Sequence, residues 1–455
     1  MRQRTMNLAA TGARVATGAA VAVGCVLAVT AAVAAPWPEV RNVAAHTLVT
    51  PVPGDATIIC GGSFRALGRE ATQADLLLSA ATPERRVDAD GHEIQVDALQ
   101  MPGVVGGEGA QSLTAAVSDR QAPLISAVEA VRLDDEDLRG FAAAPCREPS
   151  LHSWLVGGDG ATGSSDVIIL ANAGSVPTTV DLNVYADARS TTTRIVPPRT
   201  QLSLPLASVA GSAARPVIEV VASGAPVRAT LQSARVRALD AVGVDLQDGM
   251  SGPQRSLRIL GVQSPQDAPG DDATGVILRM LAPSSGASAT VRLRGAAQQQ
   301  VMQEYAVELT AGQPSEIALS GVSGSYDVEI EATAPVVAAA RQSVHSGEQE
   351  DFAWMLPAPE LVGTVPFSVP QGAAASLHLR NPGSAAITVT LEGAASDLIE
   401  LAPESAAAVA LPAGGYRLLS SEPVHASVVL RADTAVAGWP LWAPPATQQP
   451  IVVRP

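Results

Sequence analysis

The hydrophobic positions of this chain alternate with polar ones in short runs, of which TVDLNVY at residues 179–185 is the clearest. Val180, Leu182 and Val184 occupy every second position there, which is the period of a strand with one buried face. The same alternation recurs in two further runs, at Val291 and Leu293 and at Ile387, Val389 and Leu391. We predict that the three sets point into three separate sandwich cores, because a shift of one residue would expose each whole set.

These runs belong to an internal repeat that covers residues 166–236, 275–343 and 376–433. Each copy has an alternating strand, a turn of small residues, a second alternating strand and a closing Pro-Val-x-Ala step. The prolines of the three steps are Pro226, Pro335 and Pro423. Proline cannot donate a hydrogen bond to a central β-ladder, so we expect each of them to open a strand or lie on a sheet edge.

Short strands separated by turn residues at intervals of about 8–12 predict an all-β fold of tandem immunoglobulin- or fibronectin-like β-sandwich repeats. We assign one sandwich to each copy, at residues 151–255, 256–350 and 351–455, the last with a C-terminal strand. Residues 55–150 form a further β-rich segment, in which residues 71–80 could form a short helix.

An uncharged apolar run at residues 15–35 follows Arg2, Arg4 and Arg14. As a helix with a rise of about 1.5 Å per residue, it would span about 31 Å, close to the thickness of a hydrocarbon core. Arginines before such a run favour a cytoplasmic N-terminus. We therefore interpret residues 1–35 as a single-pass anchor in the plasma membrane, followed by a linker at residues 36–54 and an extracytoplasmic body. The alternative is a signal peptide cleaved near Ala34, which would release the body.

The charge balance excludes one class of partner. The chain has 29 basic and 44 acidic residues and a net charge of −15. Nucleic-acid binding needs clustered cations that neutralise phosphates. We therefore expect no nucleic-acid partner.

The chain has three cysteines, and Cys25 lies inside the apolar run. Cys60 and Cys146 are then the only thiols outside the membrane, and an oxidising compartment favours a disulfide between them. The alternative is two separate buried cysteines, because unpaired cysteine is itself often buried.

The sequence has no motif that identifies an enzyme, a metal site or a cofactor site. No two histidines stand at metal-ligand spacing. The glycine-rich residues 157–163 lack the Lys-Ser/Thr of a phosphate loop and favour a β-turn. Asp159 with Asp166, or Asp271 with Asp272, could form a carboxylate pair, although turn-forming aspartates are commoner. We therefore expect no enzymatic activity, no cofactor and no metal.

Four tryptophans fall near the joints between the copies, at Trp154, Trp354, Trp439 and Trp442. A large aromatic side chain at a joint is most often a packing anchor, and the alternative is a platform on which sugars stack.

The sequence reads CREPSLHSWLVGG at residues 146–158 and IILANAG at residues 168–174. With the later Pro-Val-x-Ala steps, this pattern resembles an actinobacterial family of secreted or membrane-anchored proteins that carry a domain of unknown function. The resemblance covers most of the chain after Cys60 and implies one N-terminal membrane segment and an extracytoplasmic β-rich body. Members are often encoded near large membrane glycosyltransferases, which implies a role in the cell envelope. The family supplies no catalytic residues.

These observations favour a membrane-tethered protein with a structural or protein-interaction role in the cell envelope. The alternative is a carbohydrate-binding accessory protein for envelope glycan assembly. The expected partner is accordingly an envelope protein or a glycan, and a row of exposed aromatic side chains on one sheet face would favour the glycan.

Overall fold

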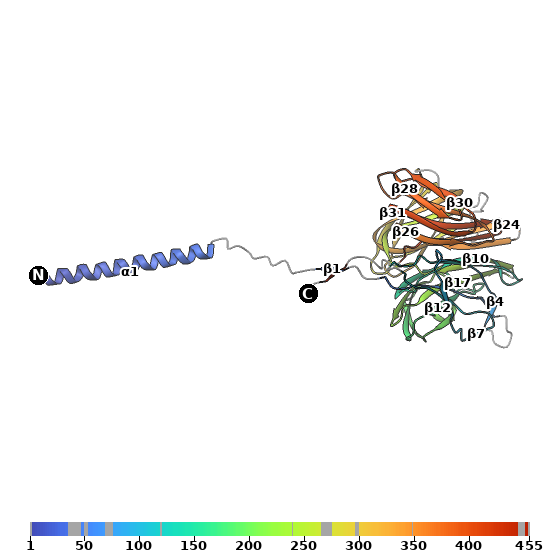
Figure 1. The fold of residues 1–455 in the computed structure, drawn as a ribbon, viewed down its shortest axis with the longest axis horizontal. Helices are drawn as coiled ribbons and strands as arrows, with labels where there is room; N and C mark the ends of the chain where they lie inside the picture. The colour runs from blue at the N-terminus through green and yellow to red at the C-terminus, as the bar shows by residue number, and fades with distance from the viewer. Residues whose placement is uncertain are drawn as a thin grey trace. The chain divides into compact units, whose positions relative to one another are not determined.

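A computed structural model describes residues 2–34, 47–49, 53–68, 76–118, 121–238, 240–264, 275–295, 300–347, 349–444 and 451–453. The chain forms two compact units, one made of Met1–Pro51 and Gln449–Pro455 and the other of Val52–Gln448. The first unit contains helix α1 (Arg2–Ala34) and a two-stranded antiparallel sheet of β1 (Thr47–Val49) and β33 (Ile451–Val453) (Figure 1). Within α1, Gly12–Ala34 is long and apolar enough to cross a membrane. This agrees with the prediction for residues 15–35, of which Ala35 lies outside the described residues.

The second unit is built of strands, which confirms the all-β prediction. Its N-terminal segment contains β2 (Ala56–Cys60), β3 (Phe64–Leu67), β4 (Leu77–Ala81), β5 (Glu84–Asp88), β6 (Ile94–Ala98), β7 (Val104–Val105), β8 (Gln111–Ala115), β9 (Ser126–Asp134) and β10 (Arg139–Cys146). These strands form three sheets of three strands, in the orders β2-β8-β6, β10-β9-β5 and β3-β4-β7. The first two sheets share a small core, which includes Ile58, Leu113 and Ile125, and a disulfide between Cys60 and Cys146 joins β2 to β10.

The first sandwich follows. It contains β11 (His152–Val156), β12 (Val167–Asn172), β13 (Thr178–Tyr185), β14 (Ser190–Val196), β15 (Thr200–Pro205), the short helix α2 (Ala207–Ala210), β16 (Val217–Ser223), β17 (Arg228–Arg237) and β18 (Asp240–Asp248). Its two antiparallel sheets have the orders β11-β16-β13-β14 and β15-β12-β17-β18. Apolar side chains of both sheets share one core, so the sheets pack face to face.

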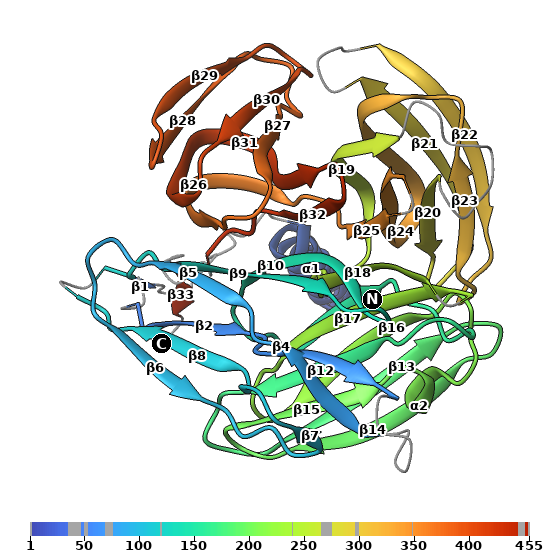
Figure 2. The same ribbon diagram turned by 90° about the vertical axis from the view of Figure 1, so that its right-hand side faces the viewer.

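The second and third sandwiches repeat this strand order. The second contains β19 (Gln254–Ser264), β20 (Val276–Leu281), β21 (Ala287–Gly295), β22 (Val301–Leu309), β23 (Ser315–Leu319), β24 (Gly324–Ser346) and β25 (Gln349–Met355). The third contains β26 (Glu360–Val369), β27 (Ala374–Arg380), β28 (Ile387–Gly393), β29 (Asp397–Leu401), β30 (Ala406–Leu411), β31 (Gly414–Ala432) and β32 (Ala435–Pro440). Figure 2 shows the first sandwich in green, the second in yellow-green to orange and the third in orange to red.

The long strands β24 and β31 each occupy the positions of two strands of the first sandwich. The first half of β24 pairs with β19 and β21, and the second half pairs with β20 and β25. In the first sandwich the chain is interrupted between β16 and β17, and Pro226 lies in that interruption, two residues before β17 begins. The expectation for the repeat prolines is therefore confirmed at Pro226.

The same expectation is wrong for Pro335 and Pro423, which lie inside β24 and β31. Both prolines lie where their strand exchanges partners: residues before Pro335 pair with β21, and Val337 onward pairs with β20. Proline is tolerated there because the ladder changes sheets at that point and needs no donor from that residue.

The predicted core positions are confirmed. The side chains at Val180, Leu182, Val184, Val291, Leu293, Ile387, Val389 and Leu391 are all buried. They fall into three different clusters of buried apolar residues, one for each sandwich. The alternating pattern thus selects the inward face of β13, β21 and β28 correctly.

An asparagine closes the same turn in the first and third sandwiches. The Asn172 side-chain amide donates to the carbonyl oxygens of Val176, Val196 and Pro197, and its Oδ1 accepts from the Gly174 amide. Asn381 makes the equivalent bonds with Ala385, Leu401, Ala402 and Gly383. Both side chains are fully buried, so four hydrogen bonds satisfy each amide.

Two local expectations differ from the structure. Leu77–Ala81 is strand β4 rather than the end of a short helix, because it pairs with β3 and buries Leu77; residues 71–75 lie outside the described part of the chain. Trp354 belongs to β25, which pairs with β24 of the second sandwich rather than leading into the third. Trp154, Trp354 and Trp439 are at most 4% exposed, as packing anchors are.

Candidate functional site

Buried polar contacts hold the parts of the second unit together and so position the candidate site. In one of these contacts, β10, β18 and β32 surround the fully buried Asp351 of β25; we call this arrangement the central junction. Asp351 Oδ1 accepts from the Val244 amide at 3.1 Å, and Oδ2 accepts from the amides of Phe141 at 3.0 Å and Val436 at 3.1 Å. One carboxyl group therefore fixes three segments that are far apart in the sequence.

Glycine makes this close approach possible. Gly140 and Gly243 have positive φ angles of 144° and 120°. A Cβ atom at Gly140 would lie 2.5 Å from Asp351 Oδ1, and one at Gly243 would lie 2.8 Å from it. Any larger residue would push the carboxyl group away from the amides it accepts from. Burial raises the pKa of Asp351 well above its usual value, against the opposing effect of these amides.

A second buried contact connects the N-terminal segment to the first sandwich. Arg228, the variable residue of the first Pro-Val-x-Ala step, is 5% exposed. It donates to the carbonyl oxygens of Ile59 at 2.8 Å and Pro145 at 2.7 Å, and it forms an ion pair with Asp248 at 3.0 Å. Ile59 and Pro145 each precede a cysteine of the disulfide, so Arg228 and the disulfide hold the same two strands.

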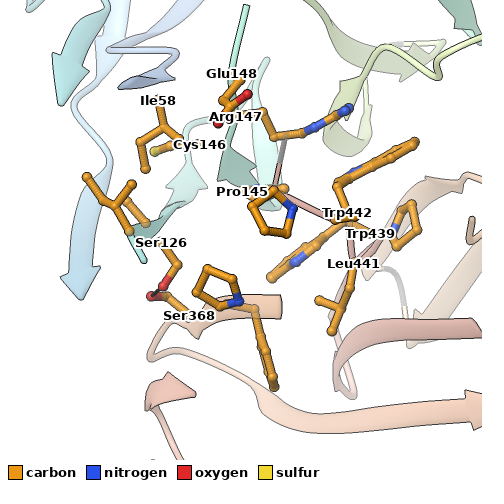
Figure 3. A pocket seen from close by; sticks show the side chains of 17 residues that line it. Ile58, Ser126, Pro145, Cys146, Arg147, Glu148, Ser368, Trp439, Leu441 and Trp442 are labelled. Atoms are coloured by element: carbon orange, nitrogen blue, oxygen red, sulfur yellow. Dashed lines mark hydrogen bonds between the residues drawn. The ribbon is translucent and has the colours of Figure 1, made fainter. Parts of the chain in front are cut away.

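A cavity of about 170 Å³ lies between this disulfide-linked segment and the third sandwich (Figure 3). Its N-terminal wall includes Ile58 of β2, Ser126 of β9 and the consecutive residues Pro145, Cys146, Arg147 and Glu148. Its other wall comes from β26, β32 and the residues after β32: Pro366, Phe367, Ser368, Trp439, Pro440, Leu441, Trp442, Ala443 and Pro444. The cavity therefore exists only when the two parts of the unit are assembled.

Rings make up most of the apolar lining. Trp439 and Phe367 belong to the core of the third sandwich and are 4% and 5% exposed. Trp442 is half-buried, and the Arg147 guanidinium lies 3.7 Å from the centroid of its ring. Figure 3 shows Arg147 and Trp442 on one side of the cavity and Ser126 and Ser368 on the other.

The polar groups of the lining differ in the interactions that they make. The hydroxyls of Ser126 and Ser368 bond to each other at 2.8 Å. Arg147 donates to the Gly249 carbonyl at 2.8 Å while it covers Trp442, and burial lowers its pKa to about 10. Burial raises the pKa of Glu148 to about 7, although the nearby Arg147 opposes that rise. Glu148 is thus an acidic residue of the lining whose neutral form is favoured by burial.

A smaller hollow of about 50 Å³ adjoins the cavity and shares Arg147 and Glu148 with it. Asp248 lines this hollow and is 4% exposed. Its Oδ1 is paired with Arg228, whereas its Oδ2 is buried and has no hydrogen-bond partner. The indole Nε1 of Trp442, in the cavity itself, is likewise buried without a partner. A buried donor and a buried acceptor therefore line the two hollows unsatisfied.

The structure brings together only some of the residues singled out from the sequence. Cys60 and Cys146 form the disulfide, and Cys146 lines the cavity. Glu129 approaches the two sulfur atoms, but a disulfide has no thiolate to offer, so this group is not a metal site in the oxidised protein. Arg147, Glu148 and Trp442 were not predicted as a group, because nothing in the sequence places residue 442 beside residue 147.

Of the carboxylate pairs considered from the sequence, Asp159 and Asp166 lie in the described part of the chain. Asp166 is buried, and its Oδ2 accepts from the Asp159 backbone amide at 2.6 Å, so it anchors the glycine-rich turn. Burial raises the pKa of Asp166 to about 7. The Gly158 carbonyl in that turn accepts from Arg279 of the second sandwich at 2.8 Å. Asp271 and Asp272 lie outside the described residues.

The chain belongs to a family of unknown function (DUF5719), whose model matches residues 104–414. The matched region begins in the N-terminal segment, includes the whole of the first and second sandwiches and ends in β31 of the third. The resemblance to a domain of unknown function is confirmed to that extent. No curated protein matches the chain.

Proposed function

We propose that the protein is a plasma-membrane-anchored, extracytoplasmic binding protein that docks an envelope protein in the cavity between the N-terminal segment and the third sandwich. The observation that carries this proposal is the cavity itself. Its walls come from two distant parts of the sequence, and they are held by a disulfide and by buried polar contacts. A preformed, largely apolar hollow with a few polar groups is the usual form of a binding site.

The apolar part of α1 supports the anchor, and Arg2, Arg4 and Arg14 in the sequence favour a cytoplasmic N-terminus. The alternative remains a signal peptide cleaved near Ala34. Sequencing the N-terminus of the mature protein separates the two, since a start at Ala35 or Pro36 would mean release rather than anchoring.

Binding is favoured over catalysis because of what the polar groups of the lining do. The two serine hydroxyls bond to each other, and neither faces a histidine among the lining residues. A serine nucleophile requires a base within hydrogen-bond reach. Arg147 and Glu148 are suited to recognising charge.

In-cell photo-crosslinking tests the proposal. A photoreactive side chain replaces Ala443, an exposed residue of the lining, and in a matched strain it replaces Leu398, an exposed residue of β29 outside the lining. We expect a discrete adduct with a protein from position 443 alone. Equal labelling from both positions would contradict the proposal that the cavity is the docking site.

The glycan alternative rests on Trp442, whose ring is half-buried rather than fully packed. Arg147 already covers one face of that ring, which leaves less of it for stacking. An adduct at position 443 that carries sugar and no peptide would favour this alternative.

A further inference from the structure

The chemistry of the cavity and the adjoining hollow limits what can occupy them. The apolar part is lined by the rings of two prolines and three aromatic residues: Pro145, Pro366, Phe367, Trp439 and Trp442. Grooves lined by aromatic rings and prolines suit polyproline II segments, which are rigid before binding and lose little conformational entropy. An apolar, extended segment with a preset backbone therefore fits this wall.

The two unsatisfied atoms specify hydrogen-bonding groups on the occupant. Trp442 Nε1 is a donor, so it requires an acceptor such as a backbone carbonyl. Asp248 Oδ2 is an acceptor on a residue of the smaller hollow, so it requires a donor. An occupant that satisfies both must present a carbonyl to the apolar cavity and N–H groups to the smaller hollow.

The charge of Glu148 favours an occupant with a basic side chain. Glu148 lines both hollows, and its nearest compensating cation, Arg147, is already bonded to the Gly249 carbonyl and stacked on Trp442. A cation from the occupant would stabilise the charged form of Glu148, whose pKa burial raises to about 7. The net charge of −15 also attracts a basic segment towards the protein.

Resting on the proposed function, we propose that the occupant is an extended, proline-containing peptide segment of the partner protein that carries an arginine or lysine. Its prolines pack against Pro145, Pro366 and Trp439, one of its carbonyls accepts from Trp442 Nε1, and its basic side chain reaches Glu148 and Asp248. The peptide is favoured over a glycan because rings dominate the lining and the one half-exposed indole is already stacked.

The test uses the full chain in detergent micelles and a labelled peptide, acetyl-Pro-Pro-Arg-Pro-Pro-amide, in a fluorescence anisotropy titration. We expect saturable binding that Glu148→Gln weakens by about tenfold, the usual effect of losing one charge-assisted hydrogen bond. Replacing the peptide arginine by citrulline should weaken binding to wild-type protein by at least the same factor, and its effect should be smaller on Glu148→Gln, in which only Asp248 remains to accept from the arginine.

Glu136→Gln is the matched control, because it removes the same charge from the exposed turn between β9 and β10, outside the lining. It should leave affinity unchanged, and unaltered melting temperatures would show that both variants fold. The inference fails if the peptide does not bind, if Glu148→Gln has no effect, or if soluble envelope glycan binds with the sensitivity expected of the peptide. If a protein adduct at position 443 persists after such a result, the docking proposal stands and only the ligand class is wrong.

Discussion

In the first sandwich, Leu182 lies among Leu155, Ile168 and Leu231, all of them apolar and buried. At the central junction, Asp351 is buried just as completely, but its neighbours are backbone amides. The sandwich interior is held by contacts without direction, so a correct period and volume are enough. The junction is held by hydrogen bonds that require particular atoms at particular places, so it fixes how the parts are assembled.

The largest expected effect is in the sandwich interior. Leu182→Asp places an unpaired carboxylate at a fully buried position and should destabilise the first sandwich by more than about 4 kcal/mol. Limited proteolysis and circular dichroism would detect its unfolding. Leu398→Asp is the control, because Leu398 is 63% exposed on β29 and the same change there should have little effect on either measurement.

The disulfide should come next. It joins residues separated by 86 positions, and its loss should destabilise the unit by about 4 kcal/mol in the chain-entropy model. Urea unfolding of the variant with Cys60→Ser and Cys146→Ser measures this. Alkylation followed by intact mass should label only Cys25 in the unreduced chain and three thiols after reduction. Three labelled thiols without reductant would contradict the bridge.

Asp351→Ala tests the junction directly. It leaves three buried amides without an acceptor, which should cost about 3 kcal/mol in total because each unsatisfied donor costs about 1–3 kcal/mol and the terms are not additive. The denaturation midpoint should fall, and binding at the cavity should weaken with it. Asp433→Ala, at an exposed position, should do neither. If the two variants behaved alike, the junction would not be what holds the parts together.

The pH dependence of stability should report a second buried contact between sandwiches. The His378 ring packs against Gly261 of the second sandwich, and burial lowers its pKa to about 4 from about 6.5. The native state therefore binds fewer protons than the unfolded state in this interval, and the contribution of His378 to stability is lost as pH falls from about 6.5 to 4.

The change His378→Gln should remove that loss. The melting temperature of wild type minus that of the variant should decrease as pH is lowered through this window. Asp166 and Asp245, whose pKa values burial raises to about 7, act in the opposite sense, since their contribution is lost as pH rises. Wild type and variant both contain Asp166 and Asp245, so the contributions of these two residues cancel in the difference between the melting temperatures. A difference that does not vary with pH would mean that the ring titrates as it does in the unfolded chain.

The smallest effect is expected in the glycine-rich turn. Asp159 Oδ1 accepts from the local Ala161 amide at 2.8 Å, so Asp159→Ala should cost less than about 1 kcal/mol and leave the fold intact. If cells with Asp159→Ala lost the wild-type envelope phenotype at normal protein abundance, this turn would instead be a functional site.

Three features could be predicted from the sequence: the all-β class, the inward-facing side chains of β13, β21 and β28, and an N-terminal helix apolar enough for a membrane. Local periodicity and residue chemistry are sufficient for these features, because each depends on neighbours within a few positions. Cys60 and Cys146 could also be matched by elimination, since no other thiol lay outside the apolar run.

The roles of the repeat prolines and of the buried acids and arginines depended on how distant segments pack together. Pro335 was expected to open a strand or lie on a sheet edge, and it lies instead where β24 changes sheets, a point that depends on which strands lie beside it. Asp351 and Arg228 could not be distinguished in the sequence from surface residues, and Trp442 could not be placed beside Arg147. Hydrogen bonds between segments that are far apart in the sequence leave no periodic pattern along the chain, so the cavity they create becomes visible only when the parts are packed together.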